Sequence, residues 1–289
     1  MLTNTTILGQ IVVNGLNLSA VYILVALGFT LLFGIMRVVN FAHGEFAMLG
    51  GFAFYYLYAV LHVPWLLAVV LGAVAVAGPS LILEWLVFRW FYHKMFQSMI
   101  GLLGLSLVMT YTSLLVWDVF ERNVPSAFDS ILRFQGVIIP MDRLVTIGVS
   151  LAALGAFYFL MVHTKIGLAM RAAAQDVEIA LTQGIDARKI YRWSFFVAVF
   201  LAALAGALYG QIYAVSPFMG ERPLFVAFIV VILGGMGSIP GAALGGIILG
   251  FTESLLGTLY GGSVASYPSF GIVILLLIFR PWGLLGTRE

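Results

Sequence analysis

The 289-residue sequence contains no cysteine, and charged residues are scarce, making up only 9% of the chain. Without cysteine, the chain has no disulfide bond, no cysteine-ligated metal site and no thiol nucleophile. Hydrophobic residues make up 62% of the sequence, and the mean hydropathy is +1.10. A soluble domain of this length does not have such a composition, so we expect an integral membrane protein.

Long stretches without Asp, Glu, Lys or Arg indicate where the chain crosses the membrane. Seven such stretches occur, and a crossing helix needs about 20 apolar residues. The stretch 46–83 is long enough for two crossings, with His62-Val63-Pro64 as the turn. The stretch 223–252 continues past the single Glu253 to about Tyr260, and its central GGMGSIPG indicates that it turns back too. We therefore predict an all-α polytopic membrane protein in which residues 1–289 form a single transmembrane domain. It should have about eight or nine segments, near 8–36, 45–61, 65–88, 99–117, 144–163, 193–213, 224–236, 240–259 and 267–280.

Basic residues are distributed unevenly between the two sides of the predicted bundle. If residues 164–192 face the cytoplasm, ten Lys and Arg residues lie inside and four lie outside, as the positive-inside rule requires. This orientation places the N-terminus outside and the C-terminus inside, and it needs an odd number of crossings. The net charge of +2 is too small to suggest nucleic acid binding. The four outer residues are Arg122, Arg133, Arg143 and Arg222.

Two connections between segments are long enough to carry a function. The outer one, 118–143, mixes acids and arginines with two prolines, and we expect a surface loop or a short interfacial helix that could meet an extracytoplasmic partner. The inner one, 165–192, is rich in Ala, Leu, Ile, Gln and Arg, with Gly184 as a break. It should form a helix, a turn and a second short helix. We interpret it as a docking surface for a cytoplasmic protein; the alternative is a solvated interfacial helix.

Within the inner connection, Glu178-Ile179-Ala180-Leu181-Thr182-Gln183-Gly184 resembles the EAA motif of ABC importer permeases. In that family, Glu-Ala-Ala and a glycine after three intervening residues form the coupling helix, which sits in a cleft of the ATPase. This sequence has Ile179 at the second position and lacks the Ile-x-Leu-Pro continuation. The resemblance implies that a set of residues couples the chain to an ATPase: Arg171, Asp176, Glu178, Ala180, Gly184, Ile185 and Asp186.

A wider resemblance covers nearly the whole chain. The segments ALGFTLLFGIMRVVNFAHGEFAMLGG, TKIGLAMRAAAQD, LTQGID and VVILGGMGSIPGAALGGIILG are similar to the permease of high-affinity branched-chain amino acid ABC transporters, the LivH type. The resemblance implies a bacterial inner-membrane subunit that partners a second related permease, two ATPase subunits and a soluble protein that delivers leucine, isoleucine or valine. ATP would be bound by the partner subunits, and this chain would bind no cofactor. A similar permease serves urea and short-amide uptake, so the substrate stays open.

Three polar residues near the end of the first segment are candidates for lining the substrate path. Asn40 and His43 would share one face of a helix, whereas Glu45 would lie about 200° around from His43. A broken or re-entrant segment would reconcile these positions and would expose backbone groups that can hold a zwitterion. Alternatively, His43 and Glu45 are interfacial groups that pair with Arg37.

Glu253 is the fourth candidate for the path, because no basic residue lies within twenty positions of it. It could accept hydrogen bonds from another segment or lie near the outer surface. Glu84 lies five residues before Arg89, and we expect an interfacial pair between them. The GGMGSIPG break in the second half, set against FGIMRVVNFAHGE in the first, is the paired arrangement that points to a central site.

The sequence contains no Walker motif, no metal-ligand spacing and no nucleophile motif. ATP chemistry must therefore belong to another chain, and we predict a transport subunit and not an enzyme. An ion-coupled secondary transporter or channel, with His43, Glu45 or Glu253 as ion sites, is the remaining alternative. An intramembrane enzyme would lack a nucleophile or ligand set to accompany His43 and Glu45.

Overall fold

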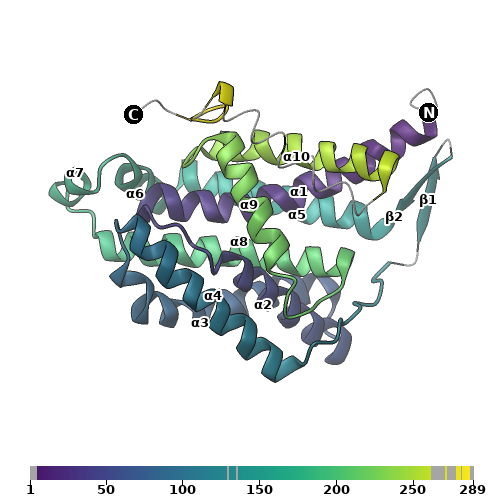
Figure 1. The fold of residues 1–289 in the computed structure, drawn as a ribbon, viewed down its shortest axis with the longest axis horizontal. Helices are drawn as coiled ribbons and strands as arrows, with labels where there is room; N and C mark the ends of the chain where they lie inside the picture. Colours follow the sequence, from purple (N-terminus) through teal and green to yellow (C-terminus); the bar gives the residue numbers. More distant parts are fainter. Residues whose placement is uncertain are drawn as a thin grey trace.

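The computed structural model describes residues 5–128, 130–134, 136–261, 271, 278–280 and 282–286. The described part is a bundle of helices with one two-stranded hairpin (Figure 1). In chain order, the elements are α1 (Thr5–Met36), α2 (His43–Tyr55) with a π-helical turn η1 (Tyr56–Val60), α3 (Trp65–Leu86), a 3₁₀ turn η2 (Phe88–Trp90), α4 (Met95–Trp117), β1 (Ile131–Phe134), β2 (Val137–Pro140), α5 (Met141–His163), α6 (Lys165–Gln175), α7 (Val177–Thr182), α8 (Ala187–Tyr213), α9 (Glu221–Gly234) and α10 (Ile239–Tyr260).

Six of the described helices are long and apolar enough to cross a membrane: α1, α3, α4, α5, α8 and α10. This confirms a helical, multi-pass membrane protein, whereas the predicted count of eight or nine segments is not confirmed. The segments expected at 45–61 and 224–236 do form helices, but α2 has 13 residues and α9 has 14. The segment expected at 267–280 lies outside the described residues, apart from 271 and 278–280.

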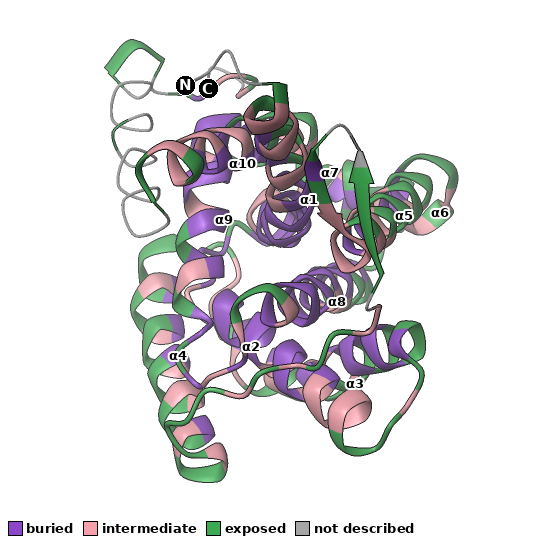
Figure 2. Cartoon of the chain, turned by 90° about the vertical axis from the view of Figure 1, so that its right-hand side faces the viewer, coloured by how far each residue is buried: buried purple, intermediate pink, exposed green. Residues whose placement is uncertain are grey.

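Helices α1 and α8 form the centre of the bundle. They pack against each other, and α1 also packs along α9 and α10 while α8 packs along α2 and α3. Seen end-on, both helices are mostly buried, whereas α4 and the outer faces of α3 and α5 are exposed (Figure 2). Most of the exposed side chains of α4 are apolar, and Leu115 is 88% exposed. Such surfaces suit lipid or another membrane subunit.

The chain re-enters the bundle after α1. Helix α1 ends at Met36, Arg37 has a φ of 51°, and residues 37–42 are not helical. The backbone then turns back along α1, so α2 begins with His43 against the carbonyl of Val25, in the middle of α1. This confirms the predicted broken segment. The physical reason is that Asn40, His43 and Glu45, which would span less than two turns of a regular helix, could not all lie on one face of it.

A second re-entrant segment follows α8. Helix α8 ends at Tyr213, Ala214 has a φ of 72°, and residues 214–220 lead to the start of α9. The starts of the two short helices meet, because a Cβ on Gly220 would lie 2.7 Å from the carbonyl oxygen of Gly44. The two halves therefore repeat one pattern, in which α1, α2 and α3 correspond to α8, α9 and α10. Since α1 and α8 run in opposite directions (Figure 1), the repeat is inverted.

The predicted pairing of breaks was wrong in the second half of the chain. GGMGSIPG forms the turn between α9 and α10, with φ values of 104° at Gly235 and 83° at Gly237, which glycine tolerates. The break that matches residues 37–42 is residues 214–220. It was missed because a stretch without charged residues continues through it to 220.

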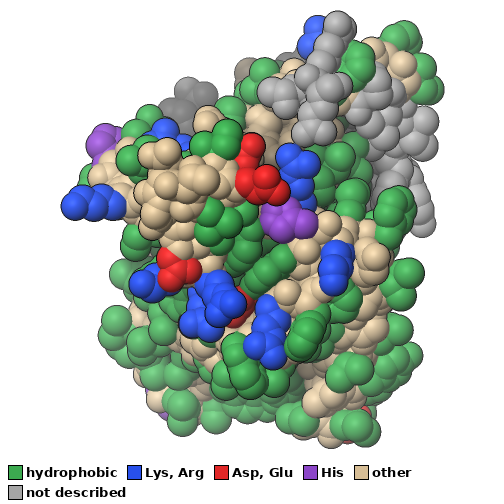
Figure 3. All heavy atoms as spheres, turned by 90° about the vertical axis from the view of Figure 1, so that its left-hand side faces the viewer, with side chains coloured by type: hydrophobic (Ala, Val, Ile, Leu, Met, Phe, Trp, Pro, Cys, Tyr) green, Lys and Arg blue, Asp and Glu red, His purple; other side chains and the backbone are tan. Residues whose placement is uncertain are grey.

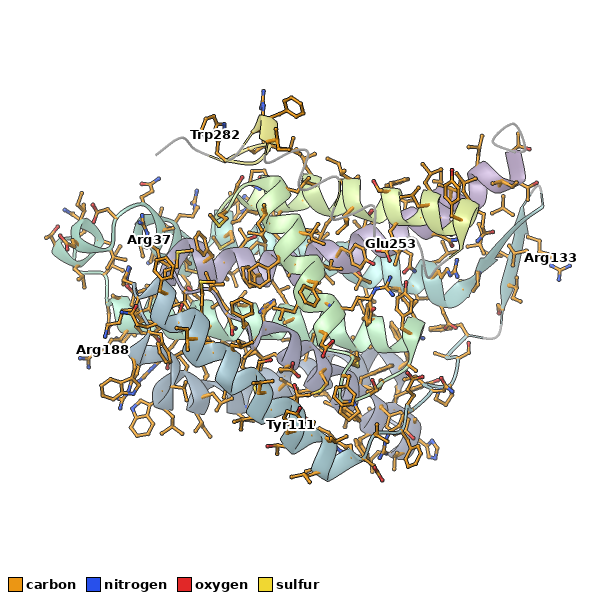
Figure 4. The ribbon with its side chains drawn as sticks, in the orientation of Figure 1. Arg37, Tyr111, Arg133, Arg188, Glu253 and Trp282 are labelled. Carbon is orange, nitrogen blue, oxygen red and sulfur yellow. The ribbon has the colours of Figure 1, made fainter. Side chains whose placement is uncertain are left out.

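The two long connections lie at opposite ends of the molecule (Figure 1). Within residues 118–143, the described part of 118–130 is a loop, as one of the two alternatives predicted, and 141–143 begin α5. The antiparallel pair of β1 and β2 was not predicted, and Gly136, with a φ of 84°, lies at its turn. We call this the hairpin end. At the opposite end, the α7 end, α6 and α7 form as predicted, and Gly184 (φ 79°) separates α7 from α8. Arg37 and Arg188 lie at the α7 end and Arg133 at the hairpin end (Figure 4).

Candidate functional site

Asn40, His43 and Glu45 are all inside the protein, with exposed fractions of 0%, 0% and 3%. His43 Nε2 lies 3.0 Å from the Val25 carbonyl oxygen, so this nitrogen donates. Glu45 Oε1 accepts from Ser106 Oγ of α4 at 3.1 Å. The alternative of interfacial groups paired with Arg37 is therefore wrong for His43 and Glu45, because the re-entrant segment carries both into the bundle.

One polar atom of each of these residues has no hydrogen-bond partner among the described residues: Asn40 Nδ2, His43 Nδ1 and Glu45 Oε2. Leaving a buried polar atom unpaired costs about 1–3 kcal/mol. A sequence selected only for stability would place apolar side chains here. The residues that start α2 therefore have spare hydrogen-bonding capacity at the junction of α1, α2 and α4.

A second polar cluster surrounds Glu253. Glu253 lies on α10 with 5% exposure, and Arg222, in the first turn of α9, forms an ion pair with its Oε1. The hydroxyl of Tyr22, on α1, donates to the other carboxylate oxygen. Glu253 is labelled in Figure 4, in the interior of the bundle below α10. The partners predicted from another segment are thus found, one on α1 and one on α9.

Arg222, which the sequence assigned to the outer side of the membrane, is only partly exposed, at 38% of its side chain. The re-entrant segment 214–220 brings the start of α9 into the bundle, and the guanidinium carbon of Arg222 lies 4.9 Å from the ring centroid of Tyr213. The Tyr213 ring in turn lies 4.7 Å from that of Tyr209. A cation held over an aromatic face is stabilised by the ring's quadrupole. Arg222 thus joins α8, α9 and α10.

Two cavities border this cluster and share Tyr213, Arg222 and Glu253 as a common wall. The α9 cavity has a volume of about 480 Å³, and the α10 cavity has a volume of about 450 Å³. Both are within the usual range for small-molecule pockets. The α9 cavity is also lined by Glu121, Tyr209, Ala214, Ser216, Phe218, Met219, Glu221, Phe225, Val226, Ile229 and Leu249, and the α10 cavity by Asn14, Asn17, Leu18, Arg143, Ile212, Ser254, Gly257 and Thr258.

The structure therefore separates the four residues proposed for the path. Glu253 borders both cavities, whereas Asn40, His43 and Glu45 border neither. Sequence reasoning missed Arg222, Tyr22 and Tyr213. The one available signal was that Glu221-Arg222 is an isolated charged pair between two charge-free stretches.

The residues proposed for ATPase coupling lie together at the α7 end. Arg171, Glu178 and Gly184 are exposed, Ile185 is half-buried and Ala180 is buried. Two members have clear local roles, since Asp176 Oδ1 accepts from the Ile179 amide at 3.0 Å and Asp186 Oδ1 accepts from the Arg188 amide at 3.0 Å. These acids cap α7 and α8.

Apolar side chains are exposed on the same segment. Leu168 is 61% exposed, Ile179 62% and Leu181 51%, at the end of the molecule where Lys and Arg side chains gather (Figure 3). Water is an unfavourable environment for such a group of side chains, and exposed apolar patches with a polar rim mark interaction sites.

Near this end, a polar network connects α3, α8 and the η2 connection. Glu84 is 4% exposed, accepts from the Tyr92 hydroxyl and lies 3.6 Å from Arg192 Nε. The predicted pairing of Glu84 with Arg89 is wrong, because Arg89 lies over the rings of Trp85 and Trp90.

His93 extends the network to α1 and α8. Its backbone amide donates to Met36 and its Nε2 lies 2.8 Å from the Tyr191 hydroxyl. Partial burial, and then Arg37, lower the pKa of His93 from 6.5, so the imidazole is neutral at pH 7. Burial and the hydrogen bond to Glu84 raise the pKa of Tyr92, so its hydroxyl keeps the proton that it donates.

Comparison with known proteins gives one family. The family model described as the permease component of the branched-chain amino acid transport system matches residues 11–279. The permease protein LivH of the high-affinity branched-chain amino acid transport system of Escherichia coli (strain K12) is 32% identical, over 96% of this chain and 94% of LivH. BraD of Pseudomonas aeruginosa, named for the same system, is 31% identical over 97% and 96% of the two chains. A probable LivH of Methanocaldococcus jannaschii is 29% identical over 93% and 90%. No solved structure gives a significant match.

Proposed function

The chain belongs to the permease family of the branched-chain amino acid transport system, and on this premise we propose that it carries leucine, isoleucine and valine through the membrane as a subunit of an ATP-driven importer. Membership of a family of transport permeases confirms the prediction of a transport subunit and not an enzyme. The substrate is inferred from the names of the relatives.

The observation that supports an amino acid is the ion pair between Arg222 and Glu253 at the common wall of the two cavities. An amino acid at neutral pH carries one carboxylate and one ammonium, so opposite charges beside a cavity suit it. Urea and short amides are neutral, and a path for them needs no such pair. The apolar lining of the α9 cavity suits branched aliphatic side chains.

We place nine crossings in the membrane. Each re-entrant segment with its short helix, 37–60 and 214–234, counts as one crossing. The last is counted from the apolar sequence 267–280 alone, because most of it lies outside the described residues. The N-terminus is then outside and the C-terminus inside the bacterial inner membrane. The substrate path follows the junction of the two re-entrant segments, with Asn40, His43 and Glu45 at one part of it and Glu253 at another.

An ABC transporter of this type implies partner components in general, and we propose their composition. A second homologous permease completes the path, two ATPase subunits bind ATP, and an extracytoplasmic binding protein delivers the substrate. The ATPase docks on α6, α7 and the following turn, where Glu178 and two apolar side chains, Ile179 and Leu181, are exposed. In this assembly the chain binds no cofactor of its own and contributes only to the substrate path.

The test is co-expression with the proteins encoded beside it, followed by purification through a tag on this chain. We expect ATPase subunits and a second permease to co-purify, and the reconstituted complex with its binding protein to concentrate radiolabelled leucine in the presence of ATP. Uptake of urea instead of leucine would identify the alternative importer. Uptake by this chain alone, driven by an ion gradient, would identify a secondary transporter.

A double variant tests the coupling segment. Glu178→Ala with Gly184→Ala should leave membrane insertion intact, because both residues are exposed at the α7 end. A Cβ at Gly184 would meet no atom within 4 Å, but its φ of 79° disfavours alanine, so this substitution acts by straining the turn after α7. We expect ATP hydrolysis to continue while leucine uptake is lost. Gln175→Ala, an exposed substitution at the end of α6, is the control. Normal uptake in the double variant would show that this segment does not couple the two activities.

A further inference from the structure

The Arg222–Glu253 pair is asymmetric in its exposure. The side chain of Glu253 is 6% exposed, whereas that of Arg222 is 38% exposed, and both border the α9 and α10 cavities. A guanidinium has five N–H donors in a planar fork. Glu253 Oε1 accepts from one terminal nitrogen, and the exposed remainder of the guanidinium faces space that a ligand can enter.

We propose that Arg222, oriented by Glu253 and Tyr213, binds the α-carboxylate of the transported amino acid, and that the acids of the α9 cavity bind its α-ammonium. This inference rests on the proposed function and adds the recognition site. A carboxylate can accept two parallel hydrogen bonds from a guanidinium, which gives both strength and orientation. The site would thus take zwitterionic α-amino acids with aliphatic side chains.

The charges of the α9 cavity fit the other half of the zwitterion. Besides Arg222, its ionisable lining consists of Glu121, Glu221 and Glu253 together with two tyrosines. Three carboxylates face one guanidinium, so a cation entering the cavity is attracted. The start of α9 also lies here, and the positive end of a helix dipole favours the carboxylate at Arg222.

The other wall of the α9 cavity is apolar. Phe225, Val226 and Ile229 lie on α9, one or two turns after Arg222, and Leu249 lies on α10, one turn before Glu253. A ligand whose headgroup contacts Arg222 would therefore place its side chain along these residues. Leucine, isoleucine and valine have side chains that match such a wall, since burying their apolar surface is favourable.

A purely structural role explains the pair less well. Replacing a buried ion pair by well-packed apolar residues is often neutral or stabilising, so helices α9 and α10 do not need opposite charges to pack. Ionisable groups within membrane segments are costly and are generally retained for function. Tyr22 and Tyr213 add further groups that orient this pair toward the common wall.

The decisive variant is Arg222→Gln combined with Glu253→Gln, in the complete transporter with its partner subunits and binding protein. Two amides can still hydrogen-bond to each other, so no buried charge is left unpaired. We expect a melting temperature close to that of the original complex and leucine uptake at least tenfold lower. Uptake within twofold of the original would overturn the proposal.

Arg222→Lys keeps the test decisive if the double variant fails to fold. Lysine preserves the ion pair with Glu253 but lacks the planar fork that binds a carboxylate at two points. If Arg222 binds the α-carboxylate, Arg222→Lys should raise the KM for leucine at least fivefold while the melting temperature stays normal. A structural ion pair predicts an unchanged KM. Gly104→Ala on α4, which borders neither cavity and where a Cβ would meet no atom within 4 Å, is the control and should leave the KM unchanged.

These results separate the site from the proposed function. Leucine uptake by the unmodified complex decides whether the transporter carries branched-chain amino acids. The ratio of variant to unmodified uptake then decides whether Arg222 binds the headgroup. An importer that carries leucine equally well with both substitutions would keep the proposed function and reject this site.

Discussion

Two glycines allow the short helices to begin in contact, and a single methyl group at either would disturb the centre of the bundle. A Cβ on Gly220 would lie 2.7 Å from the Gly44 carbonyl oxygen and 2.9 Å from its carbonyl carbon. Both atoms belong to backbone, which cannot rotate away as a side chain can. The close approach of α2 and α9 therefore depends on the missing side chain at this position.

We expect Gly220→Ala to destabilise the protein by about 1–3 kcal/mol, as overpacking of a dense interior does. Its φ of −68° suits alanine, so the effect would come from contact and not from backbone strain. Gly104→Ala on α4 is the control, because a Cβ there meets no atom within 4 Å and alanine favours a helix. Thermal unfolding in detergent measures both. Equal melting temperatures would show that the two helix starts do not touch.

His93 gives the protein a pH dependence outside the membrane segments. Partial burial and the neighbouring Arg37 lower the pKa of His93, so the folded protein prefers the neutral imidazole. The unfolded chain binds more protons than the folded one between that lowered pKa and 6.5. The stability that His93 contributes is complete above pH 6.5 and is lost as the pH falls through this window.

We therefore expect His93→Gln to reduce the fall in melting temperature between pH 7 and pH 5. His62→Gln is the matched control, because His62 is also an exposed histidine with a positive φ, 55° compared with 57° at His93. The same pH profile in His93→Gln as in the unmodified protein would show that another group is responsible.

At the scale of single residues, the sequence showed which polar side chains lie in apolar stretches, but not which side chains are their hydrogen-bond and ion-pair partners. Composition alone marked Glu253 as a carboxylate in an apolar stretch, and the geometry of a helix showed that Asn40, His43 and Glu45 needed a break. The partners of Glu253 lie 231 positions earlier, at Tyr22, and 31 positions earlier, at Arg222. Such pairs depend on how helices pack, which no local pattern specifies.

Between elements, the link from α3 to α8 through Glu84 offers a further prediction. Glu84→Gln keeps an acceptor for Tyr92 but removes the ion pair with Arg192. Because Arg192 is 54% exposed, solvent screens this pair, and we expect a loss below about 1 kcal/mol. Glu84→Leu also leaves the Tyr92 hydroxyl without its acceptor, which should cost about 1–3 kcal/mol.

Arg89 is the control for this link. The sequence favoured Arg89 as the partner of Glu84, whereas the structure places it over two tryptophan rings. Thermal unfolding of Arg89→Gln should therefore show a smaller effect than Glu84→Leu. A loss as large as that of Glu84→Leu would support the sequence-based pair.

At the scale of elements, apolar length predicted the helices well and the breaks poorly. The re-entrant segment at 37–42 was predictable because polar residues interrupt an apolar run there. The one at 214–220 was not, since its residues continue the apolar composition of α8 and the charged pair Glu221-Arg222 resembled a surface boundary. The hairpin at 131–140 was missed because four-residue strands carry little periodicity.

At the scale of the whole molecule, two inverted units, α1 to α3 and α8 to α10, form the core. Each consists of a long helix, a largely buried non-helical segment, a short helix and a second long helix, and α4, the hairpin and α5 to α7 lie between the two units in the chain. Neither short helix can cross a membrane by itself at about 1.5 Å per residue. The preceding extended segments supply the missing length and place polar residues inside the bundle. Inverted repeats of this kind put a site at their junction, which is where Arg222 and Asn40 enter the bundle.

The orientation of the molecule is a prediction that its lack of cysteine makes simple to test. Arg133→Cys places a thiol at the hairpin end, and Arg188→Cys places one at the α7 end; both side chains are exposed and lie at opposite ends (Figure 4). The positive-inside rule puts the hairpin outside. In cells with a permeabilised outer membrane and an intact inner membrane, a membrane-impermeant maleimide should label Arg133→Cys but not Arg188→Cys. After the inner membrane is permeabilised as well, both variants should be labelled. The parent chain, with no thiol, gives no background. Labelling of Arg188→Cys alone in intact cells would reverse the topology and place the proposed ATPase surface outside, where no ATPase could reach it.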